Sequence, residues 1–255
     1  MADLHVVSLR YALRPNEHVS FTNPLPMEFE TDDARFRLAE GTLTCEMKTH
    51  FADPAEARRA VEPAIRAWEI DADLRLYQGI LKFGFDGADV IDRTPPPTGV
   101  VHGTAYMVGS GLVTATGTAS VRIGYVAYPA PPPPTFRLNP DAESVLARYQ
   151  GYRDGREPLQ SMAFFCLTLV ILRAGRSQRA ASAAYRIELP TLRKMGELSS
   201  TRGDAMNARK ADAAKPLSAE HAWLEAAVKM LIWRLGDTRN AVALPMITMA
   251  DLPKL

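Results

Sequence analysis

A run of prolines at residues 129–134, PAPPPP, divides the chain into two parts. Proline has no amide hydrogen and a fixed φ angle, so such a run neither continues a helix nor lies in a central strand. Apolar residues before the run mostly alternate with polar ones, whereas those after it recur every three to four positions. We therefore predict a β-rich domain at 1–128, a proline-rich linker at 129–139 and a helical bundle at 140–255.

Charge also differs between the two parts. Residues 1–135 contain 12 Lys and Arg against 17 Asp and Glu, a balance of −5, whereas residues 136–255 contain 18 against 12, a balance of +6. A polyanion is repelled by the first part and attracted by the second. We therefore expect nucleic acid to bind the C-terminal part and a protein partner to bind the acidic N-terminal part.

The N-terminal part is predicted to be an antiparallel sheet with one inserted helix. Strands are predicted at 4–13, 26–31, 35–40, 42–51, 74–85, 99–108 and 112–128. The helix has Asp53 as a capping residue, Pro54 at its first position and an apolar stripe that includes Trp68. With the helical bundle that follows, this pattern predicts the α+β fold class.

The C-terminal part shows helical periodicity throughout most of its length. Helices are predicted at 140–154, 157–174, 178–186, 189–200 and 219–235, and an irregular tail at 237–255 has an extended piece at 241–248. The most apolar stretch, 162–172, is shorter than the about 20 residues that span a bilayer. We therefore predict that it is a buried core helix.

Few residues of this chain have the spacing of a known catalytic or metal site. Cys45 and Cys166 lie in apolar segments, which predicts buried free thiols and, with an N-terminus unlike a signal peptide, a cytoplasmic protein. The histidines lack a second ligand at metal-binding spacing, and the glycines at 103–117 do not form a phosphate-binding loop. We therefore expect no metal and no cofactor.

Two acidic clusters leave two interpretations open. The first cluster contains Glu69, Asp71 and Asp73, and the second contains Asp86, Asp89 and Asp92. Neighbouring carboxylates perform acid–base chemistry or bind metals, but they are also common at solvated helix ends and in turns. The absence of ligand spacing favours a helix end for the first cluster and an acidic turn for the second.

The candidate nucleic-acid-binding residues are basic or polar and lie close together in the C-terminal part. They are Arg193, Lys194, Arg202, Asn207, Arg209 and Lys210. Guanidinium and ammonium groups bind phosphates through charge, and arginine also does so through its forked donors. No aromatic residue is interleaved with them, which disfavours stacking on single-stranded bases. The alternative interpretation is a solvated basic surface that neighbouring acidic residues balance.

The segment at 192–235 reads LRKMGELSSTRGDAMNARKADAAKPLSAEHAWLEAAVKMLIWRL and resembles the closing part of HEPN helical domains. In that family a helix leads into an Arg-Asn-x-x-x-His motif. A short linker with Leu-Ser or Leu-Thr follows the motif, and the final helix comes after it with an acidic cap. Many members are metal-independent RNases of prokaryotic conflict systems and are often dimeric, and others are non-catalytic binding modules. The resemblance implies a homodimer with RNA as ligand.

The chain departs from the HEPN motif at the positions that carry the chemistry. Arg202 falls at the motif arginine, but Gly203 replaces the asparagine and Asn207 stands at the histidine position. Because an asparagine amide does not titrate near neutral pH, we predict a non-catalytic binding module, for RNA or another nucleic acid, in a prokaryotic defence or regulatory complex. The alternatives are a structural scaffold and a metal-independent RNase in which Arg202 acts with His221 or Arg209.

Overall fold

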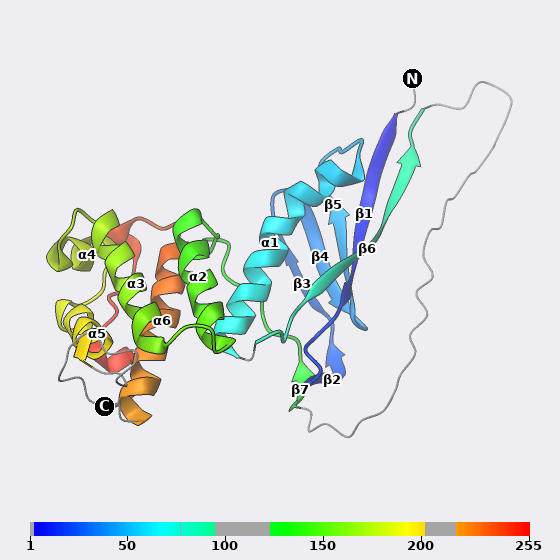
Figure 1. Ribbon diagram of the computed structural model, residues 1–255. Helices are drawn as coiled ribbons and strands as arrows, with labels where there is room; N and C mark the ends of the chain where they lie inside the picture. The colour runs from blue at the N-terminus through cyan, green and yellow to red at the C-terminus, as the bar shows by residue number, and fades with distance from the viewer. Residues whose placement is uncertain (1–2, 77, 95–122, 202–217) are drawn as a thin grey trace, which may run out of the picture. The chain divides into compact units, whose positions relative to one another are not determined.

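The computed structural model describes residues 3–76, 78–94, 123–201 and 218–255. The chain divides into two compact units, Met1–Pro134 and Thr135–Leu255 (Figure 1). The first unit consists of β-sheets with one long helix, and the second consists of helices. The α+β class predicted from the two apolar periodicities is therefore confirmed.

The first unit is built on a five-stranded antiparallel sheet with the strand order β3-β4-β5-β1-β6. Its strands are β1 (Leu4–Leu13), β3 (Met27–Glu30), β4 (Ala34–Ala39), β5 (Thr42–Met47) and β6 (Phe83–Asp92). Phe36 and Leu38 of β4 are fully buried. Arg37, between them, points to the other face and pairs with Glu28 of β3. The period of two thus gives the sheet one apolar and one charged face.

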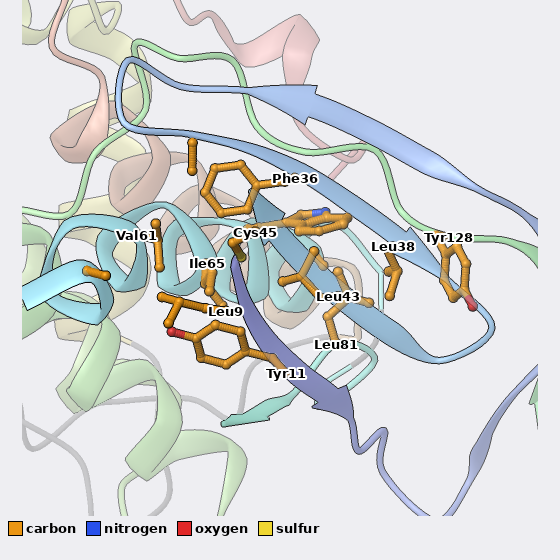
Figure 2. Close-up of a cluster of buried hydrophobic side chains, with 14 of the residues drawn as sticks. Leu9, Tyr11, Phe36, Leu38, Leu43, Cys45, Val61, Ile65, Leu81 and Tyr128 are labelled. Atoms are coloured by element: carbon orange, nitrogen blue, oxygen red, sulfur yellow. The ribbon is translucent and has the colours of Figure 1, made fainter. Parts of the chain in front are cut away.

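Helix α1 (Pro54–Arg75) supplies the other half of this unit's core. Its N-terminus forms as predicted, because the Asp53 side chain accepts a hydrogen bond from the amide of Ala55 and Pro54 occupies the first turn. Val61 and Ile65 of α1 lie among the apolar side chains of the strands (Figure 2). Cys45, whose pKa burial raises to about 12, belongs to the same cluster.

Trp68 of α1 contacts the C-terminal segment of the first unit, at the start of the proline run. Its ring is fully buried, and its indole Nε1 donates a hydrogen bond to the carbonyl oxygen of Pro129 at 2.9 Å. The neighbouring Tyr128 is also buried, and its hydroxyl accepts a hydrogen bond from the amide of Gly41 at 3.1 Å. The start of the proline run is therefore held against both the helix and the sheet.

The strand predicted at 74–85 is wrong. Helix α1 continues to Arg75, which pairs with Asp71 one turn earlier, and the strand that follows is β6, which begins at Phe83. The acidic turn predicted at Asp86–Asp92 is also wrong, because these residues lie in β6 and pair with β1. Apolar and polar residues that alternate at the end of a helix resemble a strand in the sequence. Only the pairing with β1 shows which residues form the strand.

A second, two-stranded sheet contains a strand that the alternation of residues did not indicate. Strand β2 (Val19–Leu25) pairs in parallel with β7 (Ile123–Ala127), which is the described part of the strand predicted at 112–128. The predicted strand at 99–108 lies outside the described residues.

The second unit contains the helices predicted after the proline run. They are α2 (Pro140–Arg153), α3 (Leu159–Arg173), α4 (Gln178–Tyr185), α5 (Leu189–Thr201) and α6 (Ser218–Gly236). Asn139 caps α2 and Ser177 caps α4, each through a side-chain oxygen that accepts a backbone amide hydrogen. The apolar stretch at 162–172 lies in α3, where Met162 and Cys166 are fully buried. Burial raises the pKa of the Cys166 thiol to about 12.

The helices are short or polar relative to what a bilayer requires. Among the described residues, no single helix is both long and apolar enough to cross a membrane. Helices α3 and α4 reach that length and composition only as a pair, and they are bent by 83° at their junction.

The tail after α6 differs from the extended piece predicted at 241–248. It contains two short 3-10 helices, Ala241–Ala243 and Met249–Asp251. Between them, Ile247 donates its amide hydrogen to the carbonyl of Arg186 and accepts one from the amide of Glu188, both at 2.8 Å. These contacts to the chain between α4 and α5 hold the tail against the helices.

Gly236 ends α6 where the backbone approaches another segment closely. A Cβ at this position would overlap Cε2 of Phe136 and lie 2.9 Å from its Cδ2. Phe136 stacks on Trp233 with 4.7 Å between ring centroids, so its ring has little freedom to move. We expect Gly236→Ala to lower the free energy of unfolding by about 1–3 kcal/mol, as measured by urea denaturation.

Gly151 in α2 provides a matched control for this substitution. A Cβ there would meet only the Glu157 side chain, at 3.8 Å and beyond. Since alanine is a better helix former than glycine by about 1 kcal/mol, Gly151→Ala should leave the stability unchanged or raise it. Equal effects of the two substitutions would contradict the role assigned to Phe136.

Candidate nucleic-acid interface

Two of the six predicted nucleic-acid-binding residues lie in the described part of the chain. Arg193 and Lys194 are on α5, which ends at Thr201. Arg202, Asn207, Arg209 and Lys210 fall at 202–217, outside the described residues, as does the HEPN-like motif. Helix α5 therefore leads directly into the segment that carries the other predicted residues.

The packing of α5 determines which of its basic residues is exposed. Leu192 and Met195 are buried, and this apolar side of the helix faces away from solvent. Lys194 Nζ lies 2.9 Å from Glu197 Oε1, so its charge is balanced on the same helix. Arg193 is exposed and forms no ion pair with any described residue. Of the two, Arg193 is the one available to an anionic ligand.

Helix α4 adds arginines that sequence reasoning did not select. Arg176 and Arg179 flank the start of α4, are exposed and have no ion pair within the described ranges. Helix α4 lies beside α5, because Nε2 of Gln178 is 3.5 Å from the position a Cβ of Gly196 would take. We call Arg176, Arg179 and Arg193 the basic surface of α4–α5.

A sequence signal for these residues exists in the stretch RAGRSQR, which places three arginines within seven positions. The first of them, Arg173, donates to Asp141 at 2.7 Å and is therefore neutralised. Only the structure separates the paired arginine from the two unpaired ones. It also packs α4, whose start these two arginines flank, beside α5, which begins at Leu189.

A second polar group in this unit, the Glu225 cluster, surrounds a single carboxylate. It comprises Tyr149, Tyr152 and Arg153 of α2 with His221, Glu225 and Lys229 of α6. The Tyr149 hydroxyl donates to Glu225 Oε1 at 2.9 Å, and the Tyr152 hydroxyl donates to Oε2 at 3.3 Å. His221 Nε2 lies 3.4 Å from the Tyr152 hydroxyl.

The protonation states in the Glu225 cluster limit its chemistry. Burial opposes ionisation of Glu225, but hydrogen bonds from the two tyrosines and the charges of Lys229 and Arg153 outweigh it and lower its pKa. Burial raises the pKa of Tyr152 to about 12 and also raises the pKa of Tyr149. Glu225 and the two tyrosines therefore form a hydrogen-bonded network. Of the residue types in this cluster, histidine is the one suited to proton transfer, and here it is His221.

The acidic clusters of the first unit hold its elements together. Glu69 Oε1 accepts the amide hydrogen of Phe83 at the start of β6, at 2.7 Å. Asp73 Oδ1 accepts that of Gly79 at 2.8 Å. Asp71 pairs with Arg75.

On β6, Asp89 accepts hydrogen bonds from Ser8 at 2.7 Å and from Arg10 at 2.6 Å. These two bonds to β1 lower its pKa. No group of three or more His, Cys, Asp or Glu side chains in the described ranges has metal-binding geometry. The contacts of both clusters favour a structural role over acid–base chemistry.

Comparison of the chain with protein-family models, with curated proteins and with solved structures finds no match.

Proposed function

We propose that the protein is a non-catalytic binding module for RNA or another nucleic acid. The observation that carries the proposal is the basic surface of α4–α5, where three exposed arginines have no ion pair with the described residues. Guanidinium groups that are not neutralised locally bind phosphates and release their counterions. The balance of +6 in residues 136–255 supports binding in this unit rather than in the acidic one.

The oligomeric state and the biological process that we propose follow from the HEPN resemblance. We propose a HEPN-like homodimer in the cytoplasm that acts in a prokaryotic defence or regulatory complex, and a protein partner on the acidic first unit. Arg202, Arg209 and Lys210, which directly follow α5 in the chain, would extend the basic surface of α4–α5.

Reversing two charges on this surface tests the proposal. We expect Arg179→Glu with Arg193→Glu to weaken the binding of a labelled RNA at least about tenfold, because two arginines no longer bind phosphates. Fluorescence anisotropy at several salt concentrations should also show a shallower dependence of log K on log salt, by about one unit for each arginine replaced.

Arg14→Glu with Arg93→Glu is the matched control. Both arginines are exposed in the first unit and form no ion pair with the described residues, and the pair changes the net charge by the same amount. RNA binding by this control should stay close to that of the natural protein. Equal weakening by both pairs, or binding that salt does not affect, would contradict a specific basic surface and favour the scaffold alternative.

A metal-independent RNase is the second candidate, and one contact favours it. His221 lies at the start of α6, and its Nε2 is 3.4 Å from the Tyr152 hydroxyl. It is also the histidine nearest in sequence to Arg202. The same labelled RNA, incubated without metal, separates the two candidates. Cleavage that His221→Ala abolishes would replace the binding module by the enzyme, whereas intact RNA supports the binding module.

A further inference from the structure

A charged side chain is buried in the last turn of α6. Arg234 is only 8% exposed. Its Nη2 donates a hydrogen bond to the carbonyl oxygen of Pro245 at 2.8 Å. Its Nη1 is buried and has no hydrogen-bond acceptor among the described residues. A buried guanidinium with an unused donor is unfavourable unless an acceptor reaches it.

A second arginine with an unused donor contacts the same stretch of the tail. Arg186 follows α4 in the left-handed conformation, with φ of 50°, and its Nε is buried without an acceptor in the described structure. Its carbonyl oxygen accepts the amide hydrogen of Ile247, two residues after the Pro245 that Arg234 contacts. The tail therefore brings Arg186 and Arg234 close together although they are 48 positions apart.

The carboxylate of Asp237, which acts electrostatically on Arg234, is already engaged by another arginine. Asp237 accepts hydrogen bonds from Nε and Nη2 of Arg239, at 2.9 Å and 2.5 Å. Burial is the main cause that lowers the pKa of Arg234, and the charges of Arg239 and Arg186 lower it further against the opposing effect of Asp237. Arg234 thus has two other guanidinium groups in its surroundings, and the carboxylate of Asp237 is already bound by Arg239.

We infer that Arg186 and Arg234 form a binding site for an oxyanion of the phosphate class, separate from the basic surface of α4–α5. Forked N–H donors match the oxygens of a phosphate, and charge-assisted hydrogen bonds of this kind are short and strong. Because Arg234 is buried, a terminal phosphate fits the site better than an internal phosphodiester, which carries a sugar on both sides. The site requires no nucleic acid and so goes beyond the proposed function.

Titration of the full-length protein with inorganic phosphate tests this site. We expect phosphate, but not chloride at the same ionic strength, to raise the Tm by a few degrees at concentrations well above Kd. Arg186→Gln should weaken phosphate binding about tenfold or more in calorimetric titration, because a charge-assisted hydrogen bond is removed. Arg156→Gln is the control, since Arg156 is an exposed arginine of the same unit that belongs to neither binding surface.

A second variant distinguishes a loss of phosphate binding from a loss of folding. Arg234→Lys keeps the charge and a donor for the Pro245 carbonyl but lacks the fork, so it should fold and bind phosphate at least about tenfold more weakly. Its circular dichroism spectrum should match that of the natural protein. Equal phosphate affinity in the natural protein, Arg186→Gln and Arg234→Lys would overturn the inference, as would an equal loss in Arg156→Gln.

The source of the phosphate is distinguished with two oligonucleotides of the same sequence. Tighter binding of the 5′-phosphorylated form than of the 5′-hydroxyl form, abolished in Arg186→Gln, would identify a nucleic-acid end as the ligand. Equal binding of both forms, with a phosphate titration that depends on Arg186, would identify a small phosphate compound. Failure of the proposed RNA binding leaves this second result intact, because it depends on variants outside the basic surface of α4–α5.

Discussion

Replacing Trp68 by alanine is expected to lower the free energy of unfolding by about 3–5 kcal/mol. The side chain is fully buried in the core of the first unit. Its ring lies edge-on to Phe29, with 5.1 Å between centroids, and tilted against Phe83 at 5.5 Å. The substitution removes this packing, leaves a cavity between α1 and the sheet, and also deprives the Pro129 carbonyl of its donor.

Urea denaturation followed by circular dichroism measures this effect. Trp68→Phe keeps an aromatic ring but removes the hydrogen bond, so we expect an intermediate loss of about 1–3 kcal/mol. Arg59→Ala, at an exposed position of the same helix, should change the stability by no more than about 0.5 kcal/mol. A Trp68→Ala variant as stable as this control would contradict the assignment of Trp68 to the core.

Trp223 should have an equally large effect in the second unit, about 3–5 kcal/mol on replacement by alanine. It is fully buried on α6, as predicted from its apolar stripe. Its indole Nε1, unlike that of Trp68, has no acceptor among the described residues. Trp223→Phe removes this unsatisfied donor, so its cost should be smaller than that of Trp68→Phe.

The most specific prediction is which of the two phenylalanine variants loses more stability. Both substitutions remove a similar volume from a buried site, and they differ in whether a hydrogen bond is removed. The same urea titrations measure both. A larger loss of stability for Trp223→Phe than for Trp68→Phe would show that the shape of the cavity, rather than the hydrogen bond to Pro129, controls the cost.

The limits of sequence reasoning for the candidate site are visible in the arginines. Arg193 was selected because it lies close to Arg202 and Arg209 in the chain. The sequence does not link Arg176 and Arg179 to this cluster, because α4, whose start they flank, packs beside α5 only in the folded chain. A spacing pattern does not reveal which arginine has a carboxylate partner, as the pairing of Arg173 with Asp141 shows.

What the sequence determined by itself is local. Asp53 with Pro54 and Asn139 with Pro140 start helices through bonds within a few residues, and the alternation in β4 and β5 assigns each side chain to one face of the sheet. These features depend on near neighbours, so periodicity and capping chemistry are sufficient to predict them.

What only the tertiary structure decided depends on contacts between distant residues. Strand β6 begins where Glu69 of α1 accepts the amide hydrogen of Phe83, and β2 forms because residues from 123 onward pair with it. The tail likewise brings together Arg186 and Arg234 through contacts at Pro245 and Ile247. Such pairings gain their free energy only after the chain has closed long loops, and no local pattern records which partners will meet.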